Sequence, residues 1–482
     1  MTDIYNHQSD LLTRLLRKAS GTEIGDKYVF GKINNYEEFR SRVPHHTYSN
    51  LQDSIERIKN GETDILWPGK ISNFAVSSGT TGKGKHLPLS TERLLSDRRF
   101  MRRIVFTYLR ENPSISLLGP QLSLPGSIES DLSRNIHLGE ISGFLARMIP
   151  FYLKPLQILH PSEMGAFNWE QKFNRGLQAA LKKDLRVINA VPSWTLILFQ
   201  KALEITRKKN ISEIWPNLKL ITGGGVSLQS YRDALEQLCG PLKPDFMEFY
   251  GASEGYFAFS GPKKSGELEL VLDNGIFYEW IPYSSDHYPS KDPVSLPTWE
   301  VETGTPYVIT ITNNSGLWRY PMNDIIKFTN LQPPTIRVLG RVSDMLDHYG
   351  EALHYHEAVE ALDTALTKTG GEYHRFYLAS VMDDAYSKPH HLWFVNWKTK
   401  PGTQNNLGTI IDQNICMINR HYAIRRESGA IGEPEILSVT DKILRTWIDH
   451  QSAFAAQTKI PHILHDSELA GQLYNLMDKT TY

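Results

Sequence analysis

One short segment constrains this chain more than any other. Residues 77–85 read S-S-G-T-T-G-K-G-K, so three glycines, four hydroxyl side chains and two lysines stand together with no apolar residue among them. Glycines allow backbone N–H groups to turn toward a common point. The hydroxyl groups add further donors, and the lysines neutralise charge as compact cations. The segment therefore predicts a loop that wraps an anion, for which a polyphosphate is the natural ligand.

The residues after this loop argue against a nucleoside triphosphatase of the Walker type. The spacing G-x-x-x-x-G-K fits from Gly79 to Lys85, but the motif then needs Ser or Thr to hold magnesium, and the chain has His86. Pro88 also forbids an ordinary helix directly after the loop, whereas a Walker loop opens straight into one. We expect a loop between two extended segments. The alternative is a flexible surface turn.

The composition is that of a globular chain and excludes several classes of partner. A length of 482 residues suits two or more domains. The 52 Lys and Arg residues balance 53 Asp and Glu residues, so no domain-wide basic field is available for nucleic acid. No apolar run approaches the roughly 20 residues that span a bilayer. We therefore expect no nucleic-acid or membrane partner.

The cysteines and the N-terminus bear on the compartment. Cys239 and Cys416 are the two cysteines of the chain, which excludes a disulfide framework and suits a reducing compartment. Residues 1–8 lack the charged-then-apolar order of a signal peptide. A cytoplasmic protein is expected.

Strands alternate with helices through the first half of the chain, which indicates α/β layers with partly parallel strands. From Glu267 the pattern becomes strand-rich, which predicts a β subdomain added to the α/β part. The spacing of apolar residues predicts helices over 8–20, 48–60, 92–110, 177–181, 195–208 and 228–238, and strands over 185–190, 218–221, 246–250, 268–272, 276–281 and 307–312.

A domain boundary is expected near Arg341. After it the sequence predicts a helix over 356–369 that two glycines cap, two strands, and another helix over roughly 405–422. The two strands are expected over 376–381 and 391–397. This set makes a small α+β domain of ordinary size. We therefore predict domains at 1–340 and 341–482.

A second segment, Tyr250–Gly255, has the residue types of a nucleotide site. It follows a predicted strand, at the end where open α/β sheets place ligands. Ser253 can bond a phosphate oxygen, and Glu254 can hold magnesium, which takes one or two carboxylates plus phosphate oxygens. The alternative is a turn with a solvated glutamate.

Two later segments add weaker signals. Residues 317–324 read L-W-R-Y-P-M-N-D, and the two acceptors of Asp324 match a ribose diol, although Asn-Asp is also good turn chemistry. Lys459 stands in Q-T-K-I-P at 457–461. It is a surface lysine unless its domain can swing over the glycine-rich loop.

In this order, the four segments resemble the adenylate-forming enzymes. More closely, they resemble the auxin-responsive acyl acid amido synthetases of the Gretchen Hagen 3 family, with the look of a bacterial-type member. The resemblance covers almost the whole chain, because residues 36–39, 43–44, 61–62 and 66–69 are similar to the family's lead-in. It implies a large N-terminal adenylation domain for ATP and acyl acid, and a small mobile C-terminal domain.

The resemblance also implies an ATP-dependent ligase that forms an amide (carbon–nitrogen) bond. A carboxylic acid attacks the α-phosphate of ATP and gives an acyl-adenylate and pyrophosphate. The amine of an amino acid then attacks the adenylate and releases AMP. ATP and Mg²⁺ are the implied cofactors, a small carboxylic acid and an amino acid are the implied partners, and we expect a monomer.

By position, the resemblance assigns roles to individual residues. Lys85 and Lys459 would be catalytic, and Lys459 would reach the α-phosphate when the C-terminal domain closes. Glu254 would bind the metal beside the nucleotide, Asp324 would bind the ribose hydroxyls, and Asp344 would lie at the hinge. The other nucleotide-binding residues that it implies are Ser77, Ser78, Gly79, Thr80, Thr81, Gly82, Tyr250, Ala252, Ser253 and Arg341, the last also at the hinge.

The third motif departs from the family's pattern, because Asn323 stands where glycine is usual. Asparagine tolerates positive φ better than most residues, so we expect the turn to be kept. The acyl pocket, expected between about 117 and 150 and around 187–194, gives no readable specificity. The alternatives are a ligase that passes its acyl group to coenzyme A or another thiol, a non-catalytic nucleotide-binding protein, and, least favoured, a P-loop NTPase.

Overall fold

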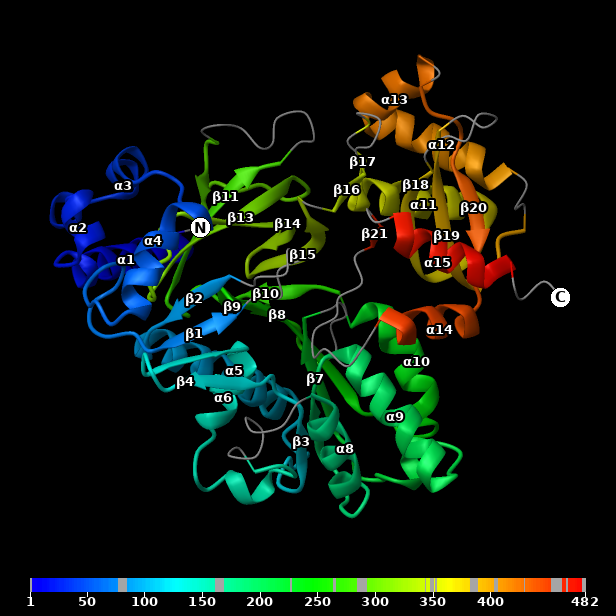
Figure 1. Ribbon diagram of the computed structural model, residues 1–482, viewed down its shortest axis with the longest axis horizontal. Coiled ribbons are helices and arrows are strands. Elements are labelled where there is room, and N and C mark those ends of the chain that lie inside the picture. Colours follow the sequence, from blue (N-terminus) through cyan, green and yellow to red (C-terminus); the bar gives the residue numbers. More distant parts are fainter. Residues whose placement is uncertain are drawn as a thin grey trace. The chain divides into compact units, whose positions relative to one another are not determined.

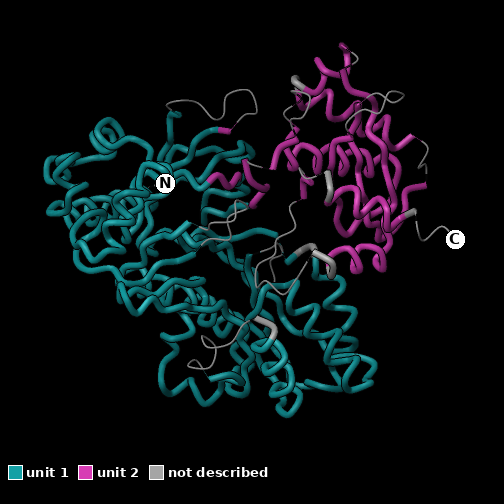
Figure 2. Tube along the Cα trace, in the orientation of Figure 1, with its two compact units in different colours: residues 1–282, 292–322, 326–337 teal, residues 283–291, 323–325, 338–482 magenta. Residues whose placement is uncertain are grey.

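The chain divides into two compact units (Figure 2). Unit 1 comprises Met1–Pro282, Asp292–Met322 and Ile326–Arg337, and unit 2 comprises Tyr283–Lys291, Asn323–Ile325 and Val338–Tyr482. The limit at 340/341 between two folded domains stays a prediction. The computed structural model describes residues 2–76, 85–160, 169–225, 228–262, 266–283, 293–342, 344–346, 351, 353–381, 389–402, 406–428, 430–451, 462–464 and 467–478.

Short helices form most of the first 60 residues of unit 1. Their apolar residues, such as Leu15, Phe39 and Ile55, are buried in the same core as the strands that follow. The helices expected over 8–20 and 48–60 are confirmed. The elements are α1 (Thr2–Ala19), α2 (Glu23–Lys27), η1 (Phe30–Lys32), α3 (Tyr36–Arg42) and α4 (Tyr48–Lys59).

An 11-stranded sheet, which belongs to unit 1 except for short parts of β14 and β15, has the order β12-β11-β13-β14-β15-β10-β9-β8-β7-β6-β3 (Figure 1). Strands β3, β6, β7 and β8 pair in parallel, and β8 then pairs antiparallel with β9. The strand-rich region therefore extends the sheet of the α/β layers. The strands are β3 (Gln121–Ser123), β6 (Val187–Asn189), β7 (Leu220–Gly224), β8 (Asp245–Ala252), β9 (Gly255–Phe259), β10 (Leu268–Leu270), β11 (Ile276–Pro282), β12 (Leu296–Pro297), β13 (Pro306–Asn313), β14 (Tyr320–Leu331) and β15 (Pro334–Arg341).

Helices pack on this sheet through aromatic and aliphatic side chains. On α5, Phe100 contacts Phe259 of β9 with ring centroids 5.6 Å apart. Helices α9 and α10 pack against each other (Figure 1), and α9 begins at Pro192, a position where proline is favoured. The helices are α5 (Thr91–Glu111), α6 (Ile141–Arg147), α8 (Trp169–Ala180), α9 (Pro192–Thr206) and α10 (Gln229–Cys239), with η2 (Lys154–Leu156) and η3 (Ile211–Glu213).

The glycine-rich loop joins two strands of a smaller sheet, as the sequence predicts. Strands β1 (Asn73–Val76) and β2 (His86–Leu89) pair antiparallel, in a four-stranded sheet of order β2-β1-β5-β4 with β4 (Ile128–Asp131) and β5 (Ile136–Gly139). Strand β2 is at the edge, where Pro88 is tolerated. Helix α5 begins only at Thr91, capped by Ser90, so the helix that a Walker loop requires does not follow directly.

Unit 2 has a four-stranded sheet in the order β20-β19-β18-β21. The helix predicted over 405–422 is wrong in one respect: it is two helices, broken at Asn419 in extended conformation. The Asn419 side chain accepts the backbone N–H of Tyr422 at 2.8 Å, which favours a new helix start over continuation. The elements are β16 (Met345–Leu346), β17 (Leu353–His354), α11 (Tyr355–Thr369), β18 (Glu372–Val381), β19 (His390–Thr399), α12 (Leu407–Ile418), α13 (Arg420–Glu427), β20 (Glu435–Ser438), α14 (Asp441–Gln451), β21 (Ile463–Leu464) and α15 (Ser467–Asp478).

Each unit has its own apolar core. Trp280 and Trp318 are fully buried in unit 1, and Trp393 and Trp447 are fully buried in unit 2. Across the described ranges, no helix combines the length and the apolar character that crossing a membrane requires.

Candidate functional site

Lys85 is the last residue of the glycine-rich segment and the one residue of it that the structure describes. Its ammonium lies between two tyrosine rings. The Nζ atom donates a hydrogen bond to Tyr320 OH at 3.4 Å. It stands 5.9 Å from the ring centroid of Tyr48 and 6.0 Å from that of Tyr320. The quadrupole of an aromatic ring attracts a cation at such distances. The two rings therefore hold the ammonium at the end of the loop.

Tyr48 is in turn held by the residue that breaks the Walker pattern. The backbone N–H of His86 donates to Tyr48 OH at 3.0 Å. The His86 ring Nδ1 lies 3.0 Å from Lys59 Nζ, which also binds Glu56 at 2.8 Å. Burial and the nearby Lys59 cation lower the pKa of His86, so the neutral ring accepts the hydrogen bond from Lys59. His86 thus supports Tyr48 through its backbone and packs against the helix that carries Lys59.

Ser253 and Glu254 form the two-residue turn between β8 and β9. The backbone carbonyl of Glu254 accepts hydrogen bonds from Arg93 Nη1 and from Asn313 Nδ2, the second at 3.1 Å. Before the turn, the Tyr250 ring packs on Phe257 with centroids 4.9 Å apart. The turn that the sequence assigns to a nucleotide is therefore anchored by side chains from two other elements.

The Glu254 side chain is close enough to Tyr320 to affect its titration. Burial raises the pKa of the Tyr320 hydroxyl, and the charges of Glu254 and Tyr48 raise it further. Tyr320 therefore keeps its proton at physiological pH. We call Lys85, Tyr48, Tyr320 and Glu254 the Lys85 cluster. It combines a cation, two phenol groups and a carboxylate, which are the groups needed to bind a metal-bound phosphate.

Arg319 stands inside the third motif but lies in the core. Its backbone has φ of 45°, and its side chain is 6% exposed. Its Nε atom donates to Glu279 Oε1 at 3.0 Å, and Nη2 donates to Ser295 Oγ at 2.7 Å. Nη1 donates to the backbone carbonyls of Arg40 and Val43 at 2.9 and 2.6 Å. These contacts tie the motif to the N-terminal helices.

Asp324 and Arg341 form an ion pair within unit 2, with Asp324 Oδ1 2.9 Å from Arg341 Nε. Asn323 has φ of 62°, in the left-handed region that favours glycine, as expected, but it lies within β14 and not in a turn. Its carbonyl accepts the N–H of Val342 at 2.9 Å. The N–H of Asp344 donates to the carbonyl of Arg341 at 2.9 Å. Arg341 and Asp344, the residues assigned to the hinge, are therefore joined by a backbone hydrogen bond in the same unit as Asp324.

The structure brings two pairs of predicted site residues together: Lys85 and Glu254 both lie near Tyr320, and Asp324 pairs with Arg341. It leaves others undescribed. Sequence reasoning missed Tyr48 and Arg93, for which the sequence has no signal, and gave no role to Tyr320, although it lies inside the third motif. The predicted residues outside the described ranges are Ser77, Ser78, Gly79, Thr80, Thr81, Gly82 and Lys459.

The metal assignment depends on one carboxylate. Among the residues that the structure describes, no group of three or more His, Cys, Asp or Glu side chains could hold a metal ion. Glu254 alone does not make a protein cage. A single carboxylate does fit Mg²⁺ that is held mainly by nucleotide phosphates and water.

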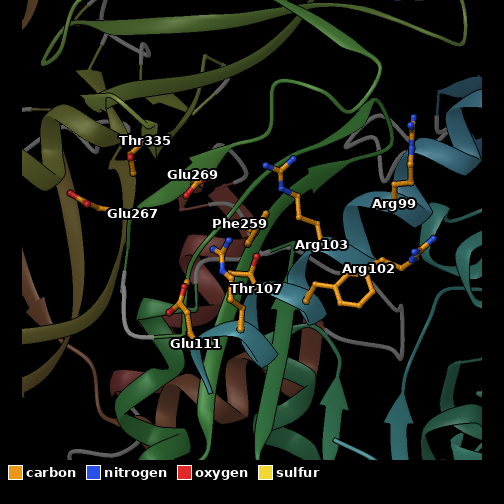
Figure 3. A pocket seen from close by; sticks show the side chains of 12 residues that line it. Arg99, Arg102, Arg103, Thr107, Glu111, Phe259, Glu267, Glu269 and Thr335 are labelled. Carbon is orange, nitrogen blue, oxygen red and sulfur yellow. The ribbon is translucent and has the colours of Figure 1, made fainter. Parts of the chain in front are cut away.

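A separate groove of about 470 Å³ runs along the exposed face of α5 (Figure 3). Arg99, Arg102 and Arg103 lie on one side of it, and Glu267 and Glu269 lie on the other. None of its lining residues belongs to the Lys85 cluster or to residues 117–150 and 187–194. The location expected for the acyl pocket therefore stays a prediction.

Comparison with known proteins agrees with this arrangement. Models of the GH3 family match the chain three times: the N-terminal domain over residues 1–204, the central domain over 269–341 and the C-terminal domain over 354–468. An indole-3-acetic acid-amido synthetase GH3.2 of Arabidopsis thaliana is 24% identical, covering 74% of this chain and 78% of that protein. A jasmonoyl–L-amino acid synthetase GH3.5 of Oryza sativa subsp. japonica is also 24% identical, covering 68% of each.

Solved structures show the same fold. The AtGH3.15 acyl acid amido synthetase in complex with 2,4-DB has a TM-score of 0.77 at 18% identity, covering 98% of this chain and 94% of that one. A 2-hydroxyisobutyryl-CoA ligase in the postadenylation state has a TM-score of 0.58 at 12% identity, covering 97% and 91%. Because the three family models together match most of its length, the chain belongs to the GH3 family.

Proposed function

We propose that this chain is an ATP-dependent acyl acid amido synthetase that joins a carboxylic acid to the amine of an amino acid. The Lys85 cluster carries the proposal, because it puts a cation at the end of a glycine-rich hairpin loop and a carboxylate beside it. Family membership supports an amino acid as the acceptor, because relatives are named indole-3-acetic acid-amido synthetase and jasmonoyl–L-amino acid synthetase.

In the first step, an oxygen of the substrate carboxylate attacks the α-phosphorus of ATP. A new oxygen–phosphorus bond forms, the bond to the β-phosphate oxygen breaks, and pyrophosphate leaves with increased negative charge. Lys85 would stabilise that charge, since a preorganised cation in a partly buried site acts more strongly than one in water. Holding the acid in line with the phosphate lowers the barrier further.

Other predicted residues complete this site as proposals. Magnesium bound to the phosphates would supply further neutralisation of charge, and Glu254 is the residue that would bind it. The hydroxyl groups of residues 77–81 would donate to phosphate oxygens, and Asp324 would bind the ribose diol. Lys459 would approach the α-phosphate when the C-terminal part turns about Arg341 and Asp344.

In the second step, the amine nitrogen attacks the carbonyl carbon of the acyl-adenylate. A carbon–nitrogen bond forms, the carbon–oxygen bond to AMP breaks, and the amine proton is released. A free carboxylate reacts poorly with amines because its charge repels nucleophiles and oxide is a poor leaving group. Adenylation removes both obstacles.

The decisive experiment is a screen for pyrophosphate release. The protein is mixed with Mg·ATP and a panel of aromatic and aliphatic acids, with no acceptor, with mixed amino acids, or with coenzyme A. We expect release that requires one of the acids, and an amide product identified by mass.

Three other outcomes would contradict the proposal. An acyl-CoA as product would identify a thiol ligase, the chemistry named for one structure of this fold. ATP binding without acid-dependent pyrophosphate would leave a non-catalytic nucleotide-binding protein. Phosphate release in the absence of any acid would identify an NTPase.

A further inference from the structure

Arg93 and Asp97 form a buried ion pair one turn apart on α5. Arg93 Nε donates to Asp97 Oδ2 at 2.7 Å, and the two side chains are 1% and 0% exposed. Breaking such a pair is costly, but exchanging it for apolar residues of similar size is often neutral or stabilising. Arg93 Nη2 and Asp97 Oδ1 also make no hydrogen bond within the described ranges. A contribution to stability is therefore a weak explanation for the presence of this ion pair.

The pair is connected to the Lys85 cluster by one backbone oxygen. Arg93 Nη1 donates to the carbonyl of Glu254 from α5, and Asn313 Nδ2 donates to the same oxygen from the end of β13. Two donors on different elements converge on one peptide group. The orientation of that peptide, and with it the direction of the Glu254 side chain, is therefore fixed from two directions.

Asn313 extends this connection toward Tyr320. Its Oδ1 atom accepts the backbone N–H groups of Ser315 at 3.0 Å and Leu317 at 3.1 Å, in the loop that leads into β14. Tyr320 opens that strand and accepts a hydrogen bond from Lys85. One continuous set of contacts in unit 1 thus joins α5, the Ser253–Glu254 turn and the tyrosine beside Lys85.

We propose that Arg93, held by Asp97, positions Glu254 for its metal ion and so sets the affinity for Mg²⁺ in the nucleotide complex. The proposal rests on the proposed function, in which Glu254 binds magnesium. Arg93 is a positioning residue, since it contacts the backbone of Glu254 and neither metal nor substrate. Its planar fork reaches Asp97 and the Glu254 carbonyl together, which the single ammonium of a lysine does less well.

The test is Arg93→Met, with a readout that needs no turnover. Titration calorimetry with α,β-methylene-ATP at a series of Mg²⁺ concentrations reports the metal needed for half-maximal binding. We expect that concentration to rise about tenfold, the scale for loss of one charge-assisted hydrogen bond. Binding of the nucleotide in EDTA should change little. The melting midpoint should fall, because the buried Asp97 loses its cation, and Arg93→Lys should restore part of both losses.

Matched variants separate positioning from general damage to α5. Arg103→Met, on the exposed face of the same helix (Figure 3), removes an ion pair with Asp273 at 2.6 Å and should leave the Mg²⁺ requirement unchanged. Asn313→Ala removes the second donor to the Glu254 carbonyl and should raise the Mg²⁺ requirement as Arg93→Met does. The effects of the two changes should not add up in the double variant. If Arg93→Met does not fold, Asp97→Asn tests the same prediction with little change in volume.

Two results would overturn the positioning role. One is a folded Arg93→Met protein whose Mg²⁺ requirement stays within twofold of the original. The other is an equal loss of nucleotide binding with and without Mg²⁺, which indicates a purely structural effect. Failure of the proposed function is seen separately: no acid gives pyrophosphate, while the shift in Mg²⁺-dependent binding persists.

Discussion

Arg319 and Asp324 belong to one motif of the sequence, yet their partners differ in burial and belong to different units. The Arg319 guanidinium is 6% exposed and donates to Glu279, Ser295 and backbone carbonyls of the N-terminal helices in unit 1. The Asp324 side chain is also 6% exposed, but its partner Arg341 is 51% exposed, and both belong to unit 2. Burial of the motif residue itself does not distinguish the two.

The difference lies in whether the partner can be exchanged. Every N–H group of Arg319 has an acceptor within the protein, including His45 Nε2 at 3.3 Å, so none remains for a phosphate. Arg341 is 51% exposed, so water can take its place as a partner. Asp324 can therefore exchange Arg341 for a ribose at a smaller cost than Arg319 could exchange Glu279. Arg319 therefore maintains the fold around the motif, whereas Asp324 is suited to bind a ligand.

The largest expected effect comes from removing Arg319. Arg319→Met leaves Glu279, which is fully buried, without its cation. Loss of one partner from a buried pair costs about 3–5 kcal/mol, which urea unfolding measures. Arg341→Met is the matched control and should cost clearly less, because the Arg341 end of its ion pair is open to solvent. Equal losses of unfolding free energy in the two variants would contradict the distinction between a structural Arg319 and an exchangeable Asp324 pair.

Lys85 should behave like Asp324, with a large effect on activity and a small one on stability. Lys85→Ala should reduce ATP–pyrophosphate exchange by about 10²–10³, the range for loss of one preorganised charge donor. Lys85 is only half-buried, so the unfolding midpoint should hardly change. Lys201→Ala, in an exposed ion pair with Glu204 on α9, is the control. A decrease of less than tenfold would contradict the role of Lys85.

The ribose contact of Asp324 can be tested with modified nucleotides. Asp324→Asn should raise the KM for ATP about tenfold, because a hydrogen bond to a charged group is lost. With 2′,3′-dideoxy-ATP, which lacks the hydroxyl groups, original and variant should have similar KM values. If the variant loses the same factor with both nucleotides, Asp324 acts through Arg341 and the fold instead.

The sequence predicts elements better than it predicts the contacts between them. Apolar periodicity is local, so the strands at β7 and β8 could be read directly, and Glu254 was found because it follows one of them. Arg93 and Glu254 are 161 residues apart, and nothing near either residue in the sequence indicates their contact. The break at Asn419 was missed because a side-chain cap inside a helical pattern leaves the apolar spacing intact.

Acid should weaken the core around Arg319 through His45. Burial and the Arg319 cation lower the pKa of His45 to about 3, while an unfolded histidine titrates near 6.5. The unfolded chain therefore binds a proton that the folded chain does not. This contribution to stability is complete above pH 6.5 and falls by about 1.4 kcal/mol per pH unit as the pH decreases toward 3.

His45→Gln should reduce the slope of stability against pH by that amount between pH 6 and 4, as measured by urea unfolding at each pH. His7→Gln, on an exposed side chain, should leave the slope unchanged. An unaltered slope in the His45 variant would mean that this ring is protonated in the folded protein, which its hydrogen bond from Arg319 argues against.

The smallest expected effect concerns Asn323, whose φ of 62° lies in the left-handed region. Asn323→Ala should cost about 1 kcal/mol in unfolding free energy, because alanine tolerates the left-handed region less well than asparagine. Asn323→Gly, the residue usual in the family, should be neutral or slightly stabilising and should keep the KM for ATP. If the two variants are equally stable, backbone geometry is not the reason for asparagine at this position. If glycine raises the KM, the Asn323 side chain, and not the backbone conformation alone, supports Asp324.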